Sequence, residues 1–382
     1  MSKRNAILIT GGSGFLASWC IARAVQAGWK VHATLRNAAR EPRIRTALAA
    51  EAEVGDRLTF FQTDLLSDAG WAEAMAGVKA VLHVASPFPS RGAPKESLTT
   101  PARDGTLRVL KAAKAAGVRR VIVTSALAVA AHRSLRELSG GARASRPLTQ
   151  ESDWTDPAQP GLSGYVISKI TAERAAWDWT QKFDAGQQLA TILPGMILGP
   201  PLDADLAPPQ RLMRRLLDGY FPALPALPTA VVDVRDLADL HLKALDAPAG
   251  ERFIAVADQT VTPQQAARVL KAHLGRTAAR APAHVLPAPL ALAAMAAAPA
   301  LRETLSLLAG GVPASNAKAR EMLGWTPRPV EQTLVDTAER LAALGALKPP
   351  RKPFEMSRLG GDRLPGRVAH IGQLLRRARA SA

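Results

Sequence analysis

Residues 7–17 read ILITGGSGFLA, an apolar strand-like run that passes into a glycine-rich turn and then into an apolar helix. Glycines let the chain turn sharply and let its backbone approach a pyrophosphate, whose charge is stabilised by the amides at a helix N-terminus. Ala17 stands where a third small residue is needed for close packing of helix on strand. The stretch therefore predicts a dinucleotide-binding turn, with a plain glycine turn as the alternative. The residues predicted to contact the cofactor here are Gly11, Gly14, Phe15 and Leu16.

The residues that follow the next expected strand, residues 30–35, indicate which dinucleotide binds. An acidic residue at this place would bind the ribose 2′-hydroxyl of NAD. The chain instead has Arg36, followed closely by Arg40, Arg43 and Arg45. A guanidinium can hold a 2′-phosphate in a charge-assisted pair, whereas a carboxylate would repel it. The sequence therefore favours NADP(H), with Arg36 as the phosphate ligand, over a merely solvated basic loop.

The rest of the first half alternates between strand-like and helical patterns. Strands are expected at residues 6–10, 30–35, 58–65, 80–86, 120–126 and 189–198, and a helical pattern covers residues 105–116. This alternation predicts an α/β fold with a doubly wound parallel sheet, the Rossmann fold, and right-handed crossovers. Ligands of such sheets lie beyond the carboxyl ends of the strands.

Tyr165 and Lys169 lie in the run SGYVISKITAE, which reads as a helix. Residues four apart share a helix face, so the phenol and the ammonium can reach one site. A nearby cation stabilises phenolate, so we expect Lys169 to lower the pKa of Tyr165 from its ordinary ~10. Together with the glycine-rich turn upstream, the pair indicates a hydride-transferring enzyme, and an ordinary amphipathic helix is the alternative.

Seven motifs that occur in a fixed order resemble the extended short-chain dehydrogenases/reductases of the NAD-dependent epimerase/dehydratase superfamily. They are TGGSGFLA (10–17), DL (64–65), HVASP (83–87), VTS (123–125), YVISK (165–169), LPGMILGP (193–200) and VDVRDLA (232–238). Within the superfamily, the chain is most similar to the branch of dihydroflavonol reductases, cinnamoyl-CoA reductases and bacterial aldehyde/ketone reductases. The resemblance covers roughly residues 5–345.

This resemblance implies NADPH-dependent reduction of an aldehyde or ketone to an alcohol. Tyr165 would protonate the carbonyl oxygen, and Lys169 would tune the tyrosine and bind the nicotinamide ribose. The same fold serves sugar-nucleotide epimerases and dehydratases with bound NAD, and a non-catalytic NADP(H)-binding protein is a third interpretation. Further cofactor contacts implied by the resemblance are Asp64, Leu65, Ala85, Ser86, Pro194 and Ile197.

The chain departs from the family at the third catalytic group. The family usually has two serines after a threonine at this strand end, and the second serine binds the substrate carbonyl. Here the run is Thr124-Ser125-Ala126, so alanine occupies the usual serine position. Ser125 is the predicted catalytic hydroxyl, and two alternatives stay open: Thr124 supplies it, or no side chain does.

Two other motifs are interpreted as structural. His83 lies in an apolar strand-like run, so we expect a packed, hydrogen-bonded histidine rather than a general base. Asp233, Arg235 and Asp236 are expected to cap a helix.

The chain has 382 residues, 47% of them hydrophobic, enough for a Rossmann domain and a smaller substrate-binding domain. The expected cofactor-binding domain is residues 1–200, to which residues 231–257 return. Residues 201–230 and 258–346 are expected to form the substrate-binding domain, and 347–382 a basic C-terminal tail. The many apolar residues of the substrate-binding segments favour a hydrophobic carbonyl compound over a sugar nucleotide.

The formal net charge of +17 raises the question of nucleic-acid binding, but no nucleic-acid-binding motif accompanies it, so no nucleic-acid partner is expected. The single cysteine, Cys20, fits a reducing compartment, and the start MSKRNAILITGG leaves no room for a signal peptide. We therefore expect a cytoplasmic enzyme. The apolar residues 285–301 are interrupted by prolines, which argues against a membrane span. No metal site is predicted, and a homodimer is the assembly that the resemblance implies.

Overall fold

The computed structural model describes residues 6–87, 96–132, 148–183, 186–287, 289–291 and 312–347. At its centre lies a seven-stranded sheet in the order β10-β6-β5-β4-β1-β2-β3, with every neighbouring pair parallel. This order is that of a Rossmann fold, so the predicted fold class is confirmed. The strands are β1 (Ala6–Ile9), β2 (Lys30–Leu35), β3 (Leu58–Gln62), β4 (Val78–His83), β5 (Arg120–Thr124), β6 (Gln188–Pro194) and β10 (Glu251–Ala255).

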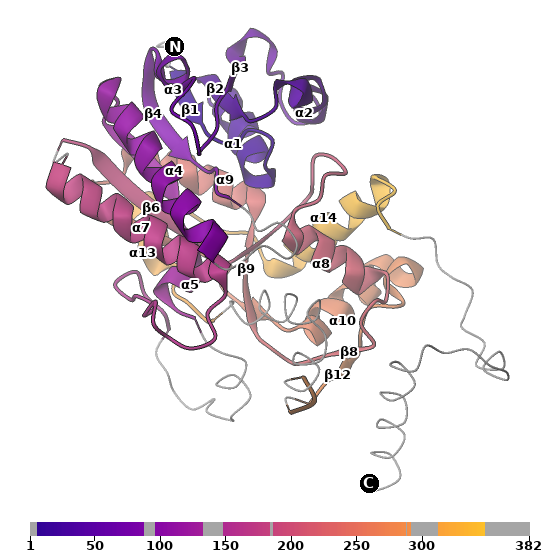
Figure 1. Ribbon diagram of the computed structural model, residues 1–382. Coiled ribbons are helices and arrows are strands. Elements are labelled where there is room, and N and C mark those ends of the chain that lie inside the picture. The colour runs from indigo at the N-terminus through magenta and orange to yellow at the C-terminus, as the bar shows by residue number, and fades with distance from the viewer. Residues whose placement is uncertain are drawn as a thin grey trace, which may run out of the picture. The chain divides into compact units, whose positions relative to one another are not determined.

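Helices cover both faces of this sheet (Figure 1). Helices α1 (Phe15–Gln26) and α9 (Val234–Lys243) pack together on one face, with the β1 side chains of Ile7 and Ile9. Helices α4 (Glu96–Ala115) and α7 (Gly164–Phe183) pack together on the other face, where Leu8 points. Because neighbouring strand residues point to opposite faces, a strand buried on both faces reads as the continuous apolar run seen in the sequence.

The segment expected as one strand over residues 189–198 is two strands. Strand β6 ends at Pro194, and β7 (Met196–Leu198) leaves the main sheet to pair with β9 (Thr229–Asp233). The break falls at Gly195, where a Cβ atom would come within 2.6 Å of the Ala230 carbonyl oxygen. The close approach of two backbones therefore requires glycine at this position and redirects the chain.

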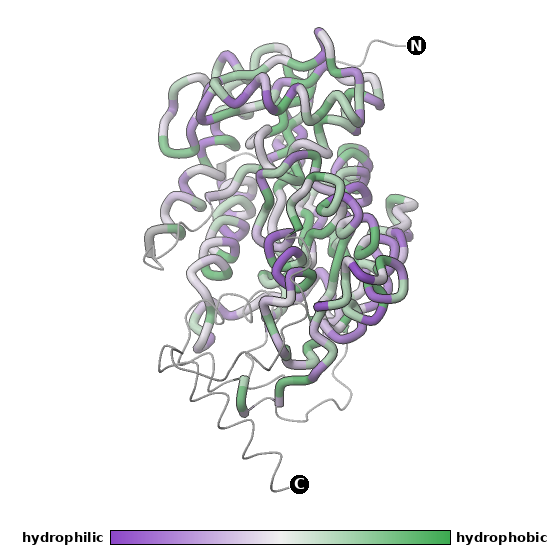
Figure 2. Tube along the Cα trace, turned by 90° about the vertical axis from the view of Figure 1, so that its right-hand side faces the viewer, coloured by the Kyte–Doolittle hydropathy of each residue, from purple (hydrophilic) through white to green (hydrophobic). Residues whose placement is uncertain are grey.

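A second, smaller sheet has the order β11-β9-β7 and includes β11 (Thr260–Val261). Within residues 231–257, β10 thus belongs to the main sheet and β9 to this smaller one. Helices α8 (Pro208–Leu217), α10 (Pro263–Leu274) and α14 (Val330–Ala343) surround an apolar core next to this sheet. The helices alternate between hydrophobic and hydrophilic colour along their length, as amphipathic helices do (Figure 2).

The remaining described α-helices and strands are short. They are α2 (Glu41–Leu48), α3 (Trp71–Met75), α5 (Leu127–Ala130), α13 (Ala317–Leu323), β8 (Ala223–Leu224) and β12 (His284–Val285). Met1–Leu347 form one compact unit, and its division into cofactor-binding and substrate-binding domains stays a prediction. The basic tail from residue 348 on, and most of the apolar stretch 285–301, lie outside the described residues. No described helix is both long and apolar enough to cross a membrane.

The chain after α13 returns to α9. Trp325 is 1% exposed, and its indole N–H donates to the Asp236 carbonyl oxygen at 2.8 Å. The Asp236 carboxylate in turn accepts from Arg328 at 2.6 Å. Asp233 is the N-cap of α9, because its carboxylate accepts from the Arg235 amide at 2.9 Å, and this confirms the predicted helix cap. Trp325 therefore anchors the last part of the described chain to the Rossmann core.

We predict that Trp325→Ala lowers the free energy of unfolding by about 3–5 kcal/mol, since it leaves a large cavity in the core. Met322→Ala is the matched control, because this side chain is 43% exposed on the adjoining helix, and it should change stability by less than ~0.5 kcal/mol. Urea unfolding monitored by circular dichroism measures both. Equal effects of the two substitutions would contradict the anchoring role of Trp325.

Candidate active site

The glycine turn after β1 is held by β2 and touches the end of β4. The amides of Gly11 and Gly12 donate to Thr34, at 3.0 Å to its hydroxyl and at 2.8 Å to its carbonyl oxygen. Gly11 has φ +73°, and a Cβ atom there would lie 3.0 Å from the Ala85 Cβ. Gly14 is the N-cap residue of α1 and has no side chain that could cap the first N–H groups of Phe15 and Leu16. This bare helix start beside a close backbone approach fits the pyrophosphate of a dinucleotide.

The arginines after β2 differ in their partners. Arg40 pairs with Asp205 and also lies 3.5 Å from the Ser13 hydroxyl in the glycine turn. Arg43 pairs with Asp203 at 3.0 Å. Arg45 pairs with Glu41 at 2.8 Å within α2. Arg36 is exposed and forms no ion pair with any described residue. The other three arginines of the predicted basic cluster are paired with carboxylates. A phosphate could therefore bind Arg36 without breaking an ion pair between described residues.

The other predicted cofactor contacts lie at the carboxyl ends of their strands. Asp64 and Leu65 follow β3, and the Asp64 carboxylate accepts from the Leu66 amide at 2.9 Å. Ala85 and Ser86 follow β4 and line a polar hollow described below. Pro194 ends β6, and Ile197 lies on β7 just beyond the break at Gly195. The fold therefore brings these residues to one edge of the sheet, and their contacts with a cofactor stay predictions.

Lys169 is buried at this edge, with 8% of its surface exposed. Its ammonium donates to the Thr124 carbonyl oxygen, the last residue of β5, at 3.0 Å. Burial lowers the pKa of Lys169 to about 8, while the charge of Glu173 acts in the opposite direction. Lys169 is therefore a buried cation that gains or loses its proton near neutral pH.

The Lys169 side chain lines the polar hollow between the ends of β4 and β5 and helices α4 and α7. Its polar lining residues are His83, Ser86, Thr106, Thr124, Ser125, Lys169 and Glu173.

Tyr165 lies one helical turn before Lys169 on α7. Burial raises the pKa of Tyr165 to about 12. The expectation that Lys169 would lower this pKa is therefore wrong, because removal of the phenol from water disfavours its charged form. Tyr165 therefore holds its proton throughout the physiological range.

The two hydroxyls at the end of β5 are both engaged with buried side chains. His241 donates from Nδ1 to the Leu237 carbonyl oxygen at 2.8 Å, so its Nε2 accepts from the Thr124 hydroxyl at 2.8 Å. Burial lowers the pKa of His241 to about 4, which keeps this imidazole neutral. The Ser125 hydroxyl donates to the Glu173 carboxylate. These contacts favour the alternative in which no side chain of this strand end reaches the substrate carbonyl. The catalytic role of Ser125 stays a prediction.

His83 is a packed, hydrogen-bonded histidine, as predicted. Its Nδ1 lies 2.9 Å from the Thr10 hydroxyl, which accepts from the Ala85 amide at 2.9 Å. Its Nε2 lies 3.4 Å from the Thr106 hydroxyl. Burial, with the charge of Lys169, lowers the pKa of His83 to about 3, so it is neutral and ties β1 to the end of β4.

Sequence reasoning missed Glu173 and His241. Glu173 lies four residues after Lys169, and this i, i+4 spacing on one helix face was a signal that could have identified it. His241 lies on α9 and contacts Thr124 across a separation of 117 residues, so no local pattern marks it.

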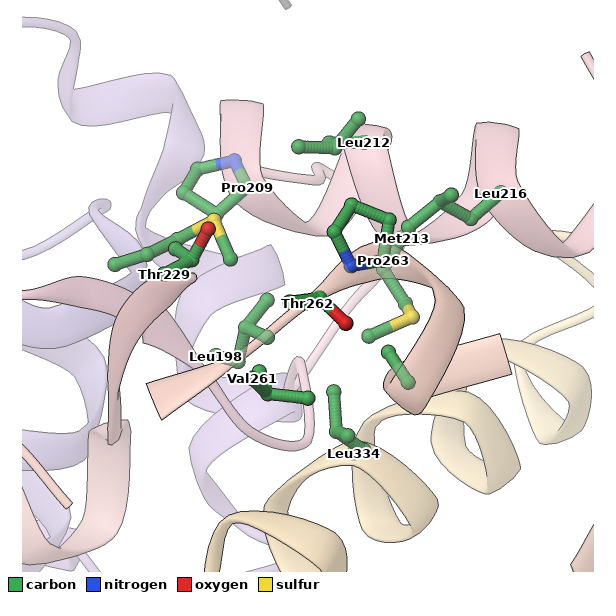
Figure 3. A pocket seen from close by; sticks show the side chains of 12 residues that line it. Leu198, Pro209, Leu212, Met213, Leu216, Thr229, Val261, Thr262, Pro263 and Leu334 are labelled. Atoms are coloured by element: carbon green, nitrogen blue, oxygen red, sulfur yellow. The ribbon is translucent and has the colours of Figure 1, made fainter. Parts of the chain in front are cut away.

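A second hollow is apolar and lies in the core around the small sheet (Figure 3). Met196 and Leu198 of β7 line it, directly after Pro194 and Gly195. Helix α8 contributes Leu212, Met213 and Leu216, and the other lining residues are Pro209, Thr229, Val261, Thr262, Pro263, Ala266 and Leu334. An apolar hollow therefore begins two residues after Pro194, one of the predicted cofactor contacts.

A parallel Rossmann sheet with a glycine turn after β1 and a Tyr/Lys pair on α7 defines a dinucleotide-binding protein of the short-chain dehydrogenase/reductase type. The model of the NAD dependent epimerase/dehydratase family matches residues 7–255. The chain belongs to this family.

Named relatives include a dihydroflavonol 4-reductase of Zea mays, 29% identical, with 71% of this chain and 74% of the relative covered. An anthocyanidin reductase of Arabidopsis thaliana is 31% identical, with 69% of this chain and 78% of the relative covered. Among solved structures, the yeast methylglyoxal/isovaleraldehyde reductase complexed with NADPH is similar with a TM-score of 0.72. It is 22% identical, and 90% of this chain and all of that chain (100%) are covered, which shows the shared fold.

Proposed function

We propose that the protein is an NADPH-dependent reductase that converts an aldehyde or ketone into an alcohol. The observation that carries the proposal is the Tyr165/Lys169 pair at the carboxyl edge of the sheet, with a buried lysine held by the end of β5. Two of the relatives in the family, the dihydroflavonol and anthocyanidin enzymes, are named as reductases, which supports a redox role over epimerisation.

The proposed chemistry divides between cofactor and protein. The reduced nicotinamide supplies the hydride that forms the new C–H bond at the carbonyl carbon. Tyr165 donates its phenolic proton to the carbonyl oxygen, which becomes the alcohol hydroxyl. Because a buried phenolate is costly, the protonated Lys169 stabilises the phenolate that remains until solvent returns the proton. Lys169 also binds the nicotinamide ribose in this proposal.

The preference for NADP(H) rests on Arg36. Its exposed guanidinium, at the end of β2, is available for a bidentate pair with the ribose 2′-phosphate. The structurally similar yeast reductase was solved with NADPH, which supports the same choice here.

The proposed substrate is hydrophobic. Met196, Leu198 and the α8 side chains of the apolar hollow supply carbon surface next to the segment that would face the nicotinamide (Figure 3). A sugar nucleotide would bring hydroxyls and phosphates that this lining leaves without hydrogen-bond partners. We therefore expect aromatic or aliphatic carbonyl compounds to be reduced.

The purified protein is expected to oxidise NADPH in the presence of hydrophobic aldehydes or ketones, measured as the loss of absorbance of the reduced nicotinamide. Tyr165→Phe should lower kcat/KM by ~100-fold or more, because the proton donor is lost. The exposed Tyr220→Phe is the matched control and should leave the rate unchanged.

Failure of both cofactors over a broad carbonyl panel would overturn the reductase proposal. Tight NADPH binding without turnover would then favour a non-catalytic binder. Isomerisation of a sugar nucleotide with retained NAD would favour an epimerase.

Arg36→Met is expected to reduce the ratio of kcat/KM for NADPH to that for NADH by about 10- to 100-fold, since a charge-assisted contact with the 2′-phosphate is lost. The kcat/KM for NADH should stay within about threefold. Arg43→Met removes an exposed guanidinium paired with Asp203 and serves as the control. An unchanged ratio in Arg36→Met would show that the phosphate binds elsewhere.

Two substitutions at the end of β5 test whether the Ser125 hydroxyl binds the substrate carbonyl. Ser125→Ala is expected to lower kcat by less than about fivefold, because this hydroxyl serves Glu173, whereas loss of a true carbonyl donor costs ~100-fold or more. Ala126→Ser restores the family's usual hydroxyl and should raise kcat by about tenfold. A 100-fold loss in Ser125→Ala, with unchanged melting temperature, would establish Ser125 as catalytic.

A further inference from the structure

The Glu173 carboxylate is the most densely bonded buried group beside Lys169. It is 1% exposed and lies one helical turn after Lys169 on α7. Ser125 donates to its Oε2. Thr191 of β6 donates to Oε1 at 2.9 Å, and Arg252 of β10 donates to the same oxygen at 2.8 Å. One carboxylate thus connects α7 with the ends or interiors of three neighbouring strands.

Arg252 is itself fixed, so the position of the Glu173 carboxylate is determined from several sides. The Arg252 guanidinium lies 3.9 Å from the centre of the Trp154 ring and donates to the Asp153 carbonyl oxygen at 2.9 Å. The Trp177 indole N–H also donates to Glu173 Oε1, at 3.3 Å. A buried ion pair with this many hydrogen bonds is costly to disturb and holds its charges at fixed places.

The Glu173 charge acts on Lys169. Among the described residues that line the polar hollow, the titratable side chains are His83 from β4, with Lys169 and Glu173 from α7. His83 is neutral, because its pKa is lowered to about 3. Arg252 does not line the hollow, and its guanidinium pairs with Glu173 at 2.8 Å. Glu173 is therefore the charge on this lining that opposes the desolvation of the Lys169 ammonium.

We propose that Glu173 is a positioning residue of the reductase site, holding the Ser125 end of β5 and supplying the negative charge that keeps Lys169 protonated. The role in turnover rests on the proposed function, whereas the electrostatic role does not. Substrate and cofactor need not touch Glu173 for this role. Without this charge, Lys169 would lose its proton at a lower pH, and the phenolate left by Tyr165 would lose its cation.

Glu173→Gln is the sharpest test, because glutamine keeps the size of the side chain and an oxygen that accepts from Thr191 and Arg252. The probe is the ¹³Cε chemical shift of Lys169 in protein labelled at its lysines, assigned by its loss in Lys169→Arg. We expect a titration midpoint of about 8 in the unaltered protein and a midpoint lower by about one unit or more in Glu173→Gln. Asp178→Asn removes the same charge from the exposed face of α7 and should leave the midpoint unchanged.

Turnover gives the second readout. The alkaline limb of the kcat/KM profile should move to lower pH in Glu173→Gln, while kcat/KM at pH values below both midpoints stays within about threefold of the original. Glu173→Asp keeps the negative charge, so the alkaline limb of its kcat/KM profile should lie at the same pH as in the unaltered protein. A merely structural role would instead lower activity equally at every pH.

Glu173→Gln leaves Arg252 as a buried unpaired cation, which endangers folding. The double substitution Glu173→Gln/Arg252→Met removes both charges and should also lower the Lys169 midpoint, but by less than Glu173→Gln alone, because the repulsion from the Arg252 cation is lost together with the attraction of Glu173. An unchanged midpoint in a folded variant overturns the proposal. Absence of turnover in the unaltered protein would overturn the reductase function instead, and the lysine titration would still decide the electrostatic role of Glu173.

Discussion

Burial of an ammonium group at the carboxyl edge of a parallel sheet is the constraint on which the site depends. Water is largely excluded from Lys169, so its protons need fixed acceptors, and the Thr124 carbonyl oxygen at 3.0 Å is one of them. That carbonyl belongs to the last residue of β5 and accepts from a side chain of α7. The Thr124 side chain is meanwhile held by His241 from the opposite helical layer. The register of α7 against β5 is thereby fixed.

The strand order explains why distant parts of the sequence meet at this edge. Between β1 and β4 the order of strands reverses, and the loops after these two strands separate to opposite faces of the sheet. Gly11 and Ala85 are in contact at this place, and Thr10 and His83 hold the two strand ends together. A dinucleotide bound across this point would therefore meet a backbone that is already in place, which spares it the cost of ordering the loops.

Local patterns were sufficient for the elements that begin and end with strong signals. The glycine turn, the helix start at Phe15 and the full extent of β2 could be predicted, since each depends on neighbouring residues. The break at Gly195 could not, because it arises from the Ala230 backbone, which is distant in sequence. For the same reason the hydrogen bond from Ser125 to Glu173 could not be predicted, since the two residues lie 48 positions apart in sequence. The pKa of Tyr165 was misjudged because burial is a tertiary property.

The ion pair between Arg40 and Asp205 connects the glycine turn with the segment that leads into α8. Arg40 lies 3.5 Å from Ser13 in the glycine turn, while Asp205 belongs to the segment that leads into α8 (Pro208–Leu217). A phosphate bound at the turn would compete with the Asp205 carboxylate for the Arg40 guanidinium. Formation of the ion pair would therefore weaken phosphate binding by the same factor by which a bound phosphate weakens the ion pair. The affinity for a dinucleotide would then depend on whether Asp205, in the segment before α8, is paired with Arg40.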